Sequence, residues 1–77
     1  MTTEYNFRLI VKDKKNGYRK VAGHDCHETK SLAGKMFYHD ENVESVCVVD
    51  VTSFCYLYLV KGQPEKTIDI SSDYSLF

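Results

Sequence analysis

The chain has 77 residues, of which 43% are hydrophobic and 27% are charged, a composition typical of one globular domain and unlike that of a disordered chain. No stretch is apolar enough to span a membrane or to form the core of a signal peptide, so we expect a soluble cytoplasmic protein. The net charge is −1, but residues 1–37 carry eight Lys or Arg against four Asp or Glu, whereas residues 38–77 carry two against seven. Such a chain can present a basic patch without being basic overall, and its three scattered cysteines exclude a disulfide scaffold.

The first predicted element is a strand over residues 5–12, in which Tyr5, Phe7, Leu9 and Val11 point to one face and Asn6, Arg8, Ile10 and Lys12 to the other. Asn16-Gly17 follows, and this dipeptide is the strongest short signal for a two-residue hairpin turn. Such a turn pairs Lys12 with Val21 and places Val21 on one face with the basic residues Arg8, Lys12, Lys14 and Arg19. A longer loop would turn the side chains of the second strand to the opposite faces.

A helix is predicted from about Cys26 or Glu28 to His39. Asp25 is the expected N-cap, because a glutamate three residues further on completes the pattern of a capping box. The expected buried stripe of the helix comprises Leu32, Ala33, Met36 and Phe37. Gly34 indicates a weaker helix or a close approach to the sheet, and Asn42 is the expected left-handed residue after the helix.

Residues 43–60 are the most strand-like stretch, because almost every position is β-branched, aromatic or aliphatic. A two-residue turn at Thr52-Ser53 would divide this stretch into two strands that are apolar on both faces. One face is aliphatic, with Val46, Val48, Leu57 and Leu59, and the other carries Phe54, Tyr56 and Tyr58. A short strand over residues 66–70 and a tail over residues 71–77 complete the chain.

The predicted fold is α+β, a single domain over residues 1–77 with the element order β-β-α-β-β-β. Its antiparallel sheet has four to five strands, with one helix packed on one face. A helix of about 12 residues is roughly 18 Å long and covers one side of such a sheet. We expect the aliphatic face to meet the helix and the tyrosine-bearing face to stay open. The alternative is that the two faces are inverted, or that the tail folds across the open one.

An open face of this composition predicts a partner-binding surface, because tyrosine and arginine dominate the energetics of protein interfaces. Its expected residues are Arg8, Lys12, Lys14, Arg19, Phe54, Tyr56 and Tyr58, and Tyr56→Ala and Tyr58→Ala should leave the fold intact. Two alternatives remain open. Aromatic and basic residues on an open sheet also suit a nucleic-acid-binding accessory protein, and two such faces can close on each other in a structural homodimer.

The residues that can carry chemistry do not form an enzyme or metal motif. His24, Cys26, His27 and His39 lack the paired spacings that place two ligands on one zinc ion. No glycine-rich phosphate loop or oriented Cys-His pair is present in the sequence. We therefore predict a non-enzymatic protein that needs no metal and no cofactor.

The predicted elements over residues 5–70 are a strand hairpin, one helix that contains Ser31 to Met36 (Ser-Leu-Ala-Gly-Lys-Met) and a long second hairpin. In this order of elements the chain resembles several small phage-encoded anti-CRISPR proteins. The resemblance implies a phage-encoded inhibitor that acts in the host cytoplasm. Those family members dock on a subunit of a host defence complex and block access to target DNA. The resemblance assigns no functional residue to this chain. The contact surface could therefore be either the acidic second half of the chain or the basic hairpin.

Overall fold

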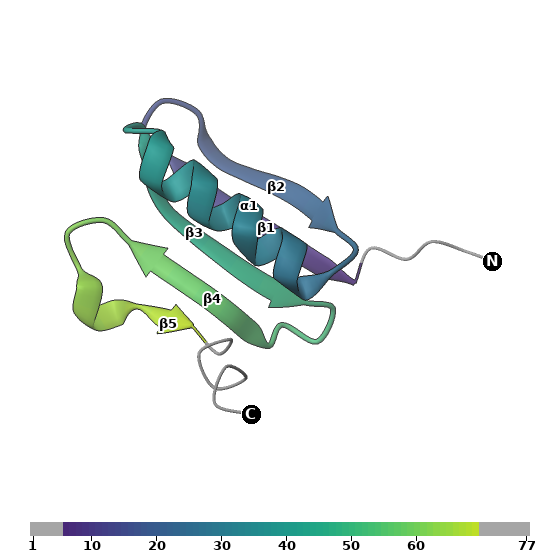
Figure 1. The fold of residues 1–77 in the computed structure, drawn as a ribbon. Coiled ribbons are helices and arrows are strands. Elements are labelled where there is room, and N and C mark those ends of the chain that lie inside the picture. The colour runs from purple at the N-terminus through teal and green to yellow at the C-terminus, as the bar shows by residue number, and fades with distance from the viewer. Residues whose placement is uncertain (1–5, 70–77) are drawn as a thin grey trace.

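The computed structural model describes residues 6–69, and within them five antiparallel strands form one sheet in the order β2-β1-β3-β4-β5. The elements are β1 (Phe7–Asp13), β2 (Gly17–Gly23), α1 (Cys26–His39), β3 (Val43–Asp50), β4 (Cys55–Val60), the short 3-10 helix η1 (Pro64–Lys66) and β5 (Ile68–Asp69) (Figure 1). This arrangement confirms the predicted α+β fold and its element order. The predicted tail, Tyr5 and Ile70 lie outside the described residues. None of the helices in residues 6–69 is long and apolar enough to cross a membrane.

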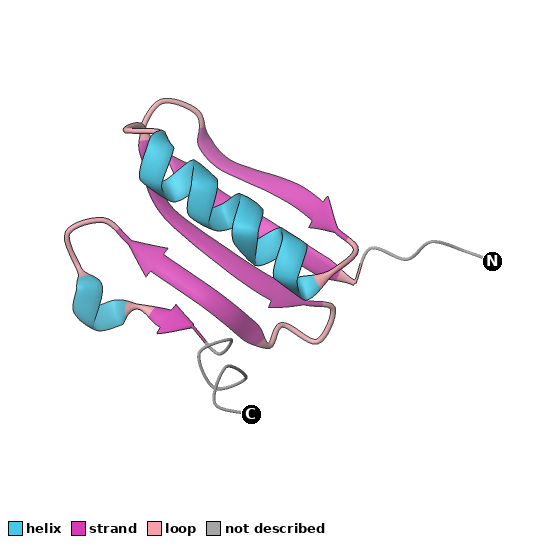
Figure 2. Ribbon diagram, viewed as in Figure 1, coloured by secondary structure: helices cyan, strands magenta, loops and turns pink. Residues whose placement is uncertain are grey.

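The helix α1 packs on one side of the sheet, above β1 and β3, while β2 and β5 form the two edges (Figure 2). The aliphatic face is the one that meets the helix, as predicted. The core consists of the buried residues Leu9, Val11, Ala33, Phe37, Val43, Val46, Val48, Leu57 and Leu59. Each Val or Leu side chain withdrawn from water contributes about 1.5–3 kcal/mol, so this single layer is the main source of stability.

The helix begins where the sequence predicts. Asp25 is the N-cap, and its carboxylate accepts a hydrogen bond of 3.0 Å from the Glu28 backbone N–H. Three details of the prediction are wrong. Leu32 is 42% exposed, since Thr29 and Lys30 take the buried positions beside Ala33 and Phe37. The end of the helix is extended at Asp40, and Asn42 is not left-handed, because its N–H donates to the Asp40 carboxylate instead. A Cβ added at Gly34 would meet no atom within 4 Å, so of the two alternatives for that glycine the close approach to the sheet is wrong.

The first hairpin has a register that differs from the prediction. Its loop contains three residues, 14–16, and Asp13 pairs with Gly17, so Lys12 lies opposite Tyr18 and not Val21. The Asp13 carboxylate accepts the backbone N–H groups of Lys15 and Asn16 at 2.7 and 3.2 Å, and Gly17 adopts the left-handed conformation. The side chain of Asp13 therefore organises the longer loop. The side chains of β2 are turned to the faces opposite those predicted from a two-residue turn.

The second hairpin keeps most of the predicted register but changes it near the loop. Val46, Val48 and Cys47 pair with Leu59, Leu57 and Tyr58 as expected, whereas Val49 pairs with Cys55 and not with Tyr56. The loop spans residues 51–54 rather than two residues, with Ser53 left-handed. The resulting β-bulge inserts one extra residue into β4, so Tyr56 leaves the predicted face.

Candidate functional site: the open face of the sheet

The open face is the side of the sheet that lies away from α1. Directly paired residues of neighbouring strands project to the same side, so the register identifies its members. They are Arg8, Ile10, Lys12, Tyr18, Lys20, Ala22, Ser45, Cys47, Val49, Cys55, Tyr58, Val60 and Ile68. Among the described elements, no helix is packed on this side of the sheet.

The open face combines an apolar centre with a basic border. Ile10, Val49, Val60 and Tyr58 are half-buried along β1, β3 and β4, and Ile68 at the β5 edge is 45% exposed. The basic side chains come from the other half of the sheet, with Arg8 and Lys12 on β1 and Lys20 on β2. This composition, an apolar centre with charges at the side, is the arrangement found in protein interfaces.

Acidic groups are nearly absent from the described part of this face. None of its strand residues is acidic, and Glu44, at its border, pairs with Lys12 at 3.6 Å. The carboxylates of Asp13 and Asp50 lie on the helix side of the sheet. The uneven distribution of charge along the sequence therefore becomes a distribution in space, with positive potential over the half of the open face formed by β1 and β2.

Two hollows lie on the open face. One has a volume of about 430 Å³ and is lined by residues that include Lys12, Lys14, Tyr18, Tyr58 and Val60. The other has a volume of about 310 Å³ and is lined by residues that include Arg8, Ile10, Lys20 and Val49. Both are open depressions that bring a basic side chain beside an apolar one, and such depressions accept the projecting side chains of a partner.

The structure brings together four of the seven residues that the sequence assigned to this face. Arg8, Lys12 and Tyr58 lie on it, and Lys14 lines the hollow at its border.

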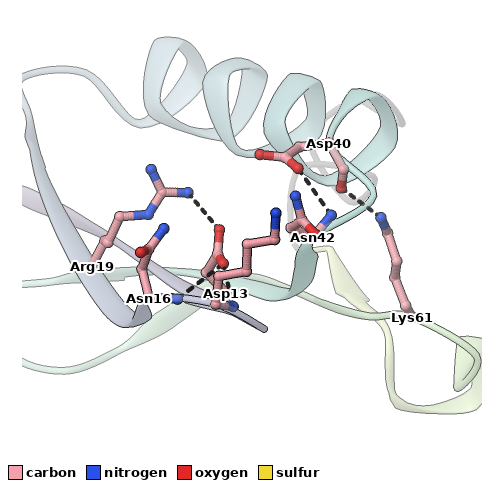
Figure 3. Close-up of polar contacts among 7 residues, drawn as sticks. Asp13, Asn16, Arg19, Asp40, Asn42 and Lys61 are labelled. Carbon is pink, nitrogen blue, oxygen red and sulfur yellow. Dashed lines mark hydrogen bonds and ion pairs between the residues drawn. The ribbon is translucent and has the colours of Figure 1, made fainter.

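Arg19 lies on the helix side, and its predicted placement is wrong. Its guanidinium Nη2 is 3.3 Å from the Asp13 carboxylate, which is buried (Figure 3). The pKa of Asp13 is held below its ordinary value, mainly by the hydrogen bond that its carboxylate accepts from the backbone N–H of Lys15. The N–H of Asn16 and the positive charge of Arg19 lower this pKa further. Val21, which was expected beside Arg19 on the open face, packs against the core instead.

Tyr56 and Phe54 are also misplaced by the prediction. The Tyr56 ring packs at the edge of the core, with its centroid 5.5 Å from that of Phe7 and 5.0 Å from that of Phe54. The Tyr56 hydroxyl donates a hydrogen bond of 2.8 Å to the Asp50 carboxylate. Tyr56, Phe7 and Asp50 therefore support the end of the core near the 51–54 loop, while Phe54 is 52% exposed and lies in the loop against the Tyr56 ring.

The Asp50 carboxylate holds the 51–54 loop in place. It accepts hydrogen bonds from the backbone N–H and the hydroxyl of Thr52, at 2.8 and 2.6 Å, and from the backbone N–H of Phe54 at 3.0 Å. The Thr52 hydroxyl, followed by the Tyr56 hydroxyl and these N–H groups, lowers the pKa of Asp50 to about 2. The four donors favour a loop of four residues over the predicted two-residue turn.

Sequence reasoning missed Tyr18, Lys20 and Ala22, which β2 contributes to the open face. The available signal was Asp13, three residues before Asn16, since an aspartate at the start of a loop accepts the N–H groups that follow it. That signal favours a three-residue loop followed by a left-handed glycine, the commonest hairpin connection after the two-residue turns.

The described part of the open face contains no group of side chains that could hold a metal ion. Within residues 6–69 no three His, Cys, Asp or Glu side chains are placed to hold one metal ion. Comparison of the chain with protein-family models, with curated proteins and with solved structures finds no match. The evidence on the function of this chain is therefore the shape and the charge of the open face.

Proposed function

We propose that this chain is a small non-enzymatic binding protein that docks on an acidic surface of another protein through the open face of its sheet. The observation that carries the proposal is the apolar centre beside Arg8, Lys12, Lys14 and Lys20, on a side of the sheet that no described element covers. The apolar centre favours burial by a partner, and the basic border favours a partner of opposite charge.

Nucleic acid fits this face less well than protein does. A sheet that binds single strands presents several aromatic rings on which bases stack. Tyr56 packs at the edge of the core and Phe54, 52% exposed, lies in the 51–54 loop, so the strands of the face carry Tyr18, 69% exposed, and the half-buried Tyr58. The rest of the centre is aliphatic, which suits the side chains of a protein.

The resemblance in element order to anti-CRISPR proteins remains a prediction about the kind of partner. A subunit of a defence complex is compatible with the proposal if its contact surface is acidic. The proposal itself requires only that acidity and an exposed apolar patch for the centre of the open face.

The test compares matched substitutions on the two sides of the molecule. Immobilised protein is incubated with lysate of the source cells, either untreated or treated with nuclease, and the retained proteins are identified by mass spectrometry. Lys20→Glu and Tyr58→Ala change the open face, whereas Lys35→Glu and Tyr38→Ala change exposed positions of the helix. We expect the two helix variants to retain the same partner as the unchanged protein and the two open-face variants to lose at least about tenfold in retention.

Equal retention by all four variants would exclude the open face as the docking site. Retention that disappears with nuclease treatment would instead assign the face to nucleic acid, which salt-dependent binding of a defined oligonucleotide would then measure.

A further inference from the structure

Two thiols meet on the open face. Cys47 lies in the middle of β3 and Cys55 begins β4, and the register places both on the same side of the sheet, diagonal to one another. Their Sγ atoms are 3.6 Å apart, which is van der Waals contact between two sulfur atoms. The contact lies beside the bulge that displaces Tyr56, so the irregular part of the hairpin is the part that brings the sulfurs together.

Neither thiol belongs to the buried core. Cys47 and Cys55 are half-buried, and the core cluster on the other side of the sheet is made without them. The Cys55 thiol also lies 3.5 Å from the Leu57 carbonyl oxygen, a weak hydrogen bond. Such a pair is reachable from solvent, and its two sulfurs are already neighbours.

We propose that Cys47 and Cys55 form a modification site, a dithiol that closes to an intramolecular disulfide by exchange with a low-molecular-weight disulfide such as oxidised glutathione. The Cys55 thiolate attacks one sulfur of glutathione disulfide, forms a mixed disulfide and releases one glutathione thiolate. Cys47 then loses its proton to solvent, its thiolate attacks Cys55 Sγ, and the second glutathione leaves as a thiolate that takes up a proton from solvent. The two protein thiols lose two electrons and two protons, and two molecules of reduced glutathione take them up.

The environment of Cys47 explains why Cys55 acts first. Burial, followed by the hydrogen bond with the neighbouring Cys55 thiol, raises the pKa of Cys47 to about 12, so Cys47 is protonated at neutral pH. A thiol in that state is a poor attacking group towards an external disulfide. It becomes effective only when a mixed disulfide is held beside it, where the contact of 3.6 Å supplies a high effective concentration.

The bond would link β3 to β4 across the 51–54 loop. It would lie beside Val49 and Tyr58, their cross-strand neighbours on the open face. The oxidised and reduced proteins would therefore differ on the surface that we propose for docking. The existence of the disulfide does not depend on that proposal, because its test requires no partner.

The test incubates the full-length protein with oxidised glutathione, alkylates the remaining thiols and maps the peptides by mass spectrometry. We expect a species lighter by two hydrogen atoms in which Cys47 and Cys55 are linked and Cys26 is alkylated. Cys26→Ser is the matched control and should form the same link. Cys47→Ser should retain glutathione on Cys55, because the group that displaces it is missing.

A second measurement does not rely on variants that fold. The ratio of linked protein to glutathione adduct is measured in buffer and in urea, and we expect it to fall by about tenfold when unfolding separates the sulfurs. An equal ratio in both solvents, accumulation of glutathione adducts alone in the folded protein, or a link that involves Cys26 would each overturn the proposal.

Discussion

Two aspartates decide much of this structure at the scale of single residues. Asp13 and Asp50 each end a strand, and each accepts backbone N–H groups of the loop that follows. Both also hold a side chain on the helix side of the sheet, Arg19 in the first case and Tyr56 in the second. One short carboxylate therefore sets the loop length and the direction in which the next strand presents its side chains.

The pH dependence of stability tests the role of Asp50. Its pKa is lowered from 3.8 to about 2 in the folded protein, so the ionised group stabilises the fold above pH 3.8 and this contribution is lost as the pH falls through about 2. Asp50→Asn should lower the melting temperature at neutral pH, and the difference from the unchanged protein should shrink towards about pH 2. A difference that is constant from neutral to acid pH would show that the charge of Asp50 contributes nothing.

Two glycines should respond in opposite ways to substitution by alanine. A Cβ at Gly23 would lie 3.1 Å from both Cβ and Cγ2 of Thr29 and overlap its hydroxyl, which donates a 2.6 Å hydrogen bond to the Asp25 carbonyl. Gly23→Ala should therefore destabilise the protein by about 1–3 kcal/mol. Gly34 has open space around it within α1, so Gly34→Ala should stabilise by about 0.5–1 kcal/mol. Urea unfolding measures both, and a stable Gly23→Ala variant would contradict the packing of β2 against α1.

The two tyrosines of β4, which the sequence predicted on one face, should differ in how much their substitution by alanine destabilises the protein. Tyr56 packs against the core and bonds to Asp50, so Tyr56→Ala should lower the free energy of unfolding by about 3–5 kcal/mol. Tyr58 lies on the open face, and Tyr58→Ala should cost about 1 kcal/mol or less. Urea unfolding of the two variants separates these values, and equal losses would contradict the bulge in β4.

At the scale of elements, α1 and the short edge strand β5 are fastened by one ion pair. Lys30 is one of the buried residues of α1, with 9% of its side chain exposed, and its Nζ lies 2.6 Å from the Asp69 carboxylate. The described part of β5 is two residues long, and backbone pairing over that length holds a strand weakly. The ion pair therefore adds a side-chain link between the helix layer and the edge of the sheet.

Substitutions at the two ends of this ion pair should have unequal effects. Asp69→Ala leaves the Lys30 ammonium buried and unpaired and should destabilise by about 1–3 kcal/mol. Lys30→Met removes the charge but keeps an apolar side chain of similar length, so its cost should be below about 1 kcal/mol. Urea unfolding compares them, and a larger loss for Lys30→Met would show that the charge stabilises the fold.

At the scale of the whole molecule, the two sides of the sheet have different tasks. The helix side contains the buried core, while the open face presents apolar and basic groups to solvent. Two copies that met through their open faces would bring the basic borders into one interface, where like charges oppose association. The same border attracts an acidic partner.

We therefore expect the isolated chain to be a monomer of 8.9 kDa by light scattering, at low and at high salt. High salt screens the repulsion between basic borders, so a dimer that forms only there would show that the apolar centre also mediates self-association. A dimer at every salt concentration would assign the open face to a second copy and contradict the proposed docking surface.

The sequence by itself determined the elements and their order, and it favoured the aliphatic face as the one that the helix covers. These depend on local patterns: the alternation of apolar residues in strands, the capping box at Asp25 and the aliphatic stripe of Val46, Val48, Leu57 and Leu59. Four members of the predicted binding face, Arg8, Lys12, Lys14 and Tyr58, were also found from alternation alone, since they precede the first loop, lie within it or follow the bulge.

Only the tertiary structure decided the direction of the other side chains. A strand has a side-chain period of two, so one residue more or less in a loop exchanges its two faces. The hydrogen bonds of Asp13 and Asp50 selected the longer loops, and the contacts of Arg19 with Asp13 and of Tyr56 with Phe7 hold the resulting registers. The contact between Cys47 and Cys55 beside the bulge depends on the same loop length. These two residues come close because β3 pairs with β4 in this register, and not because of their separation in the chain.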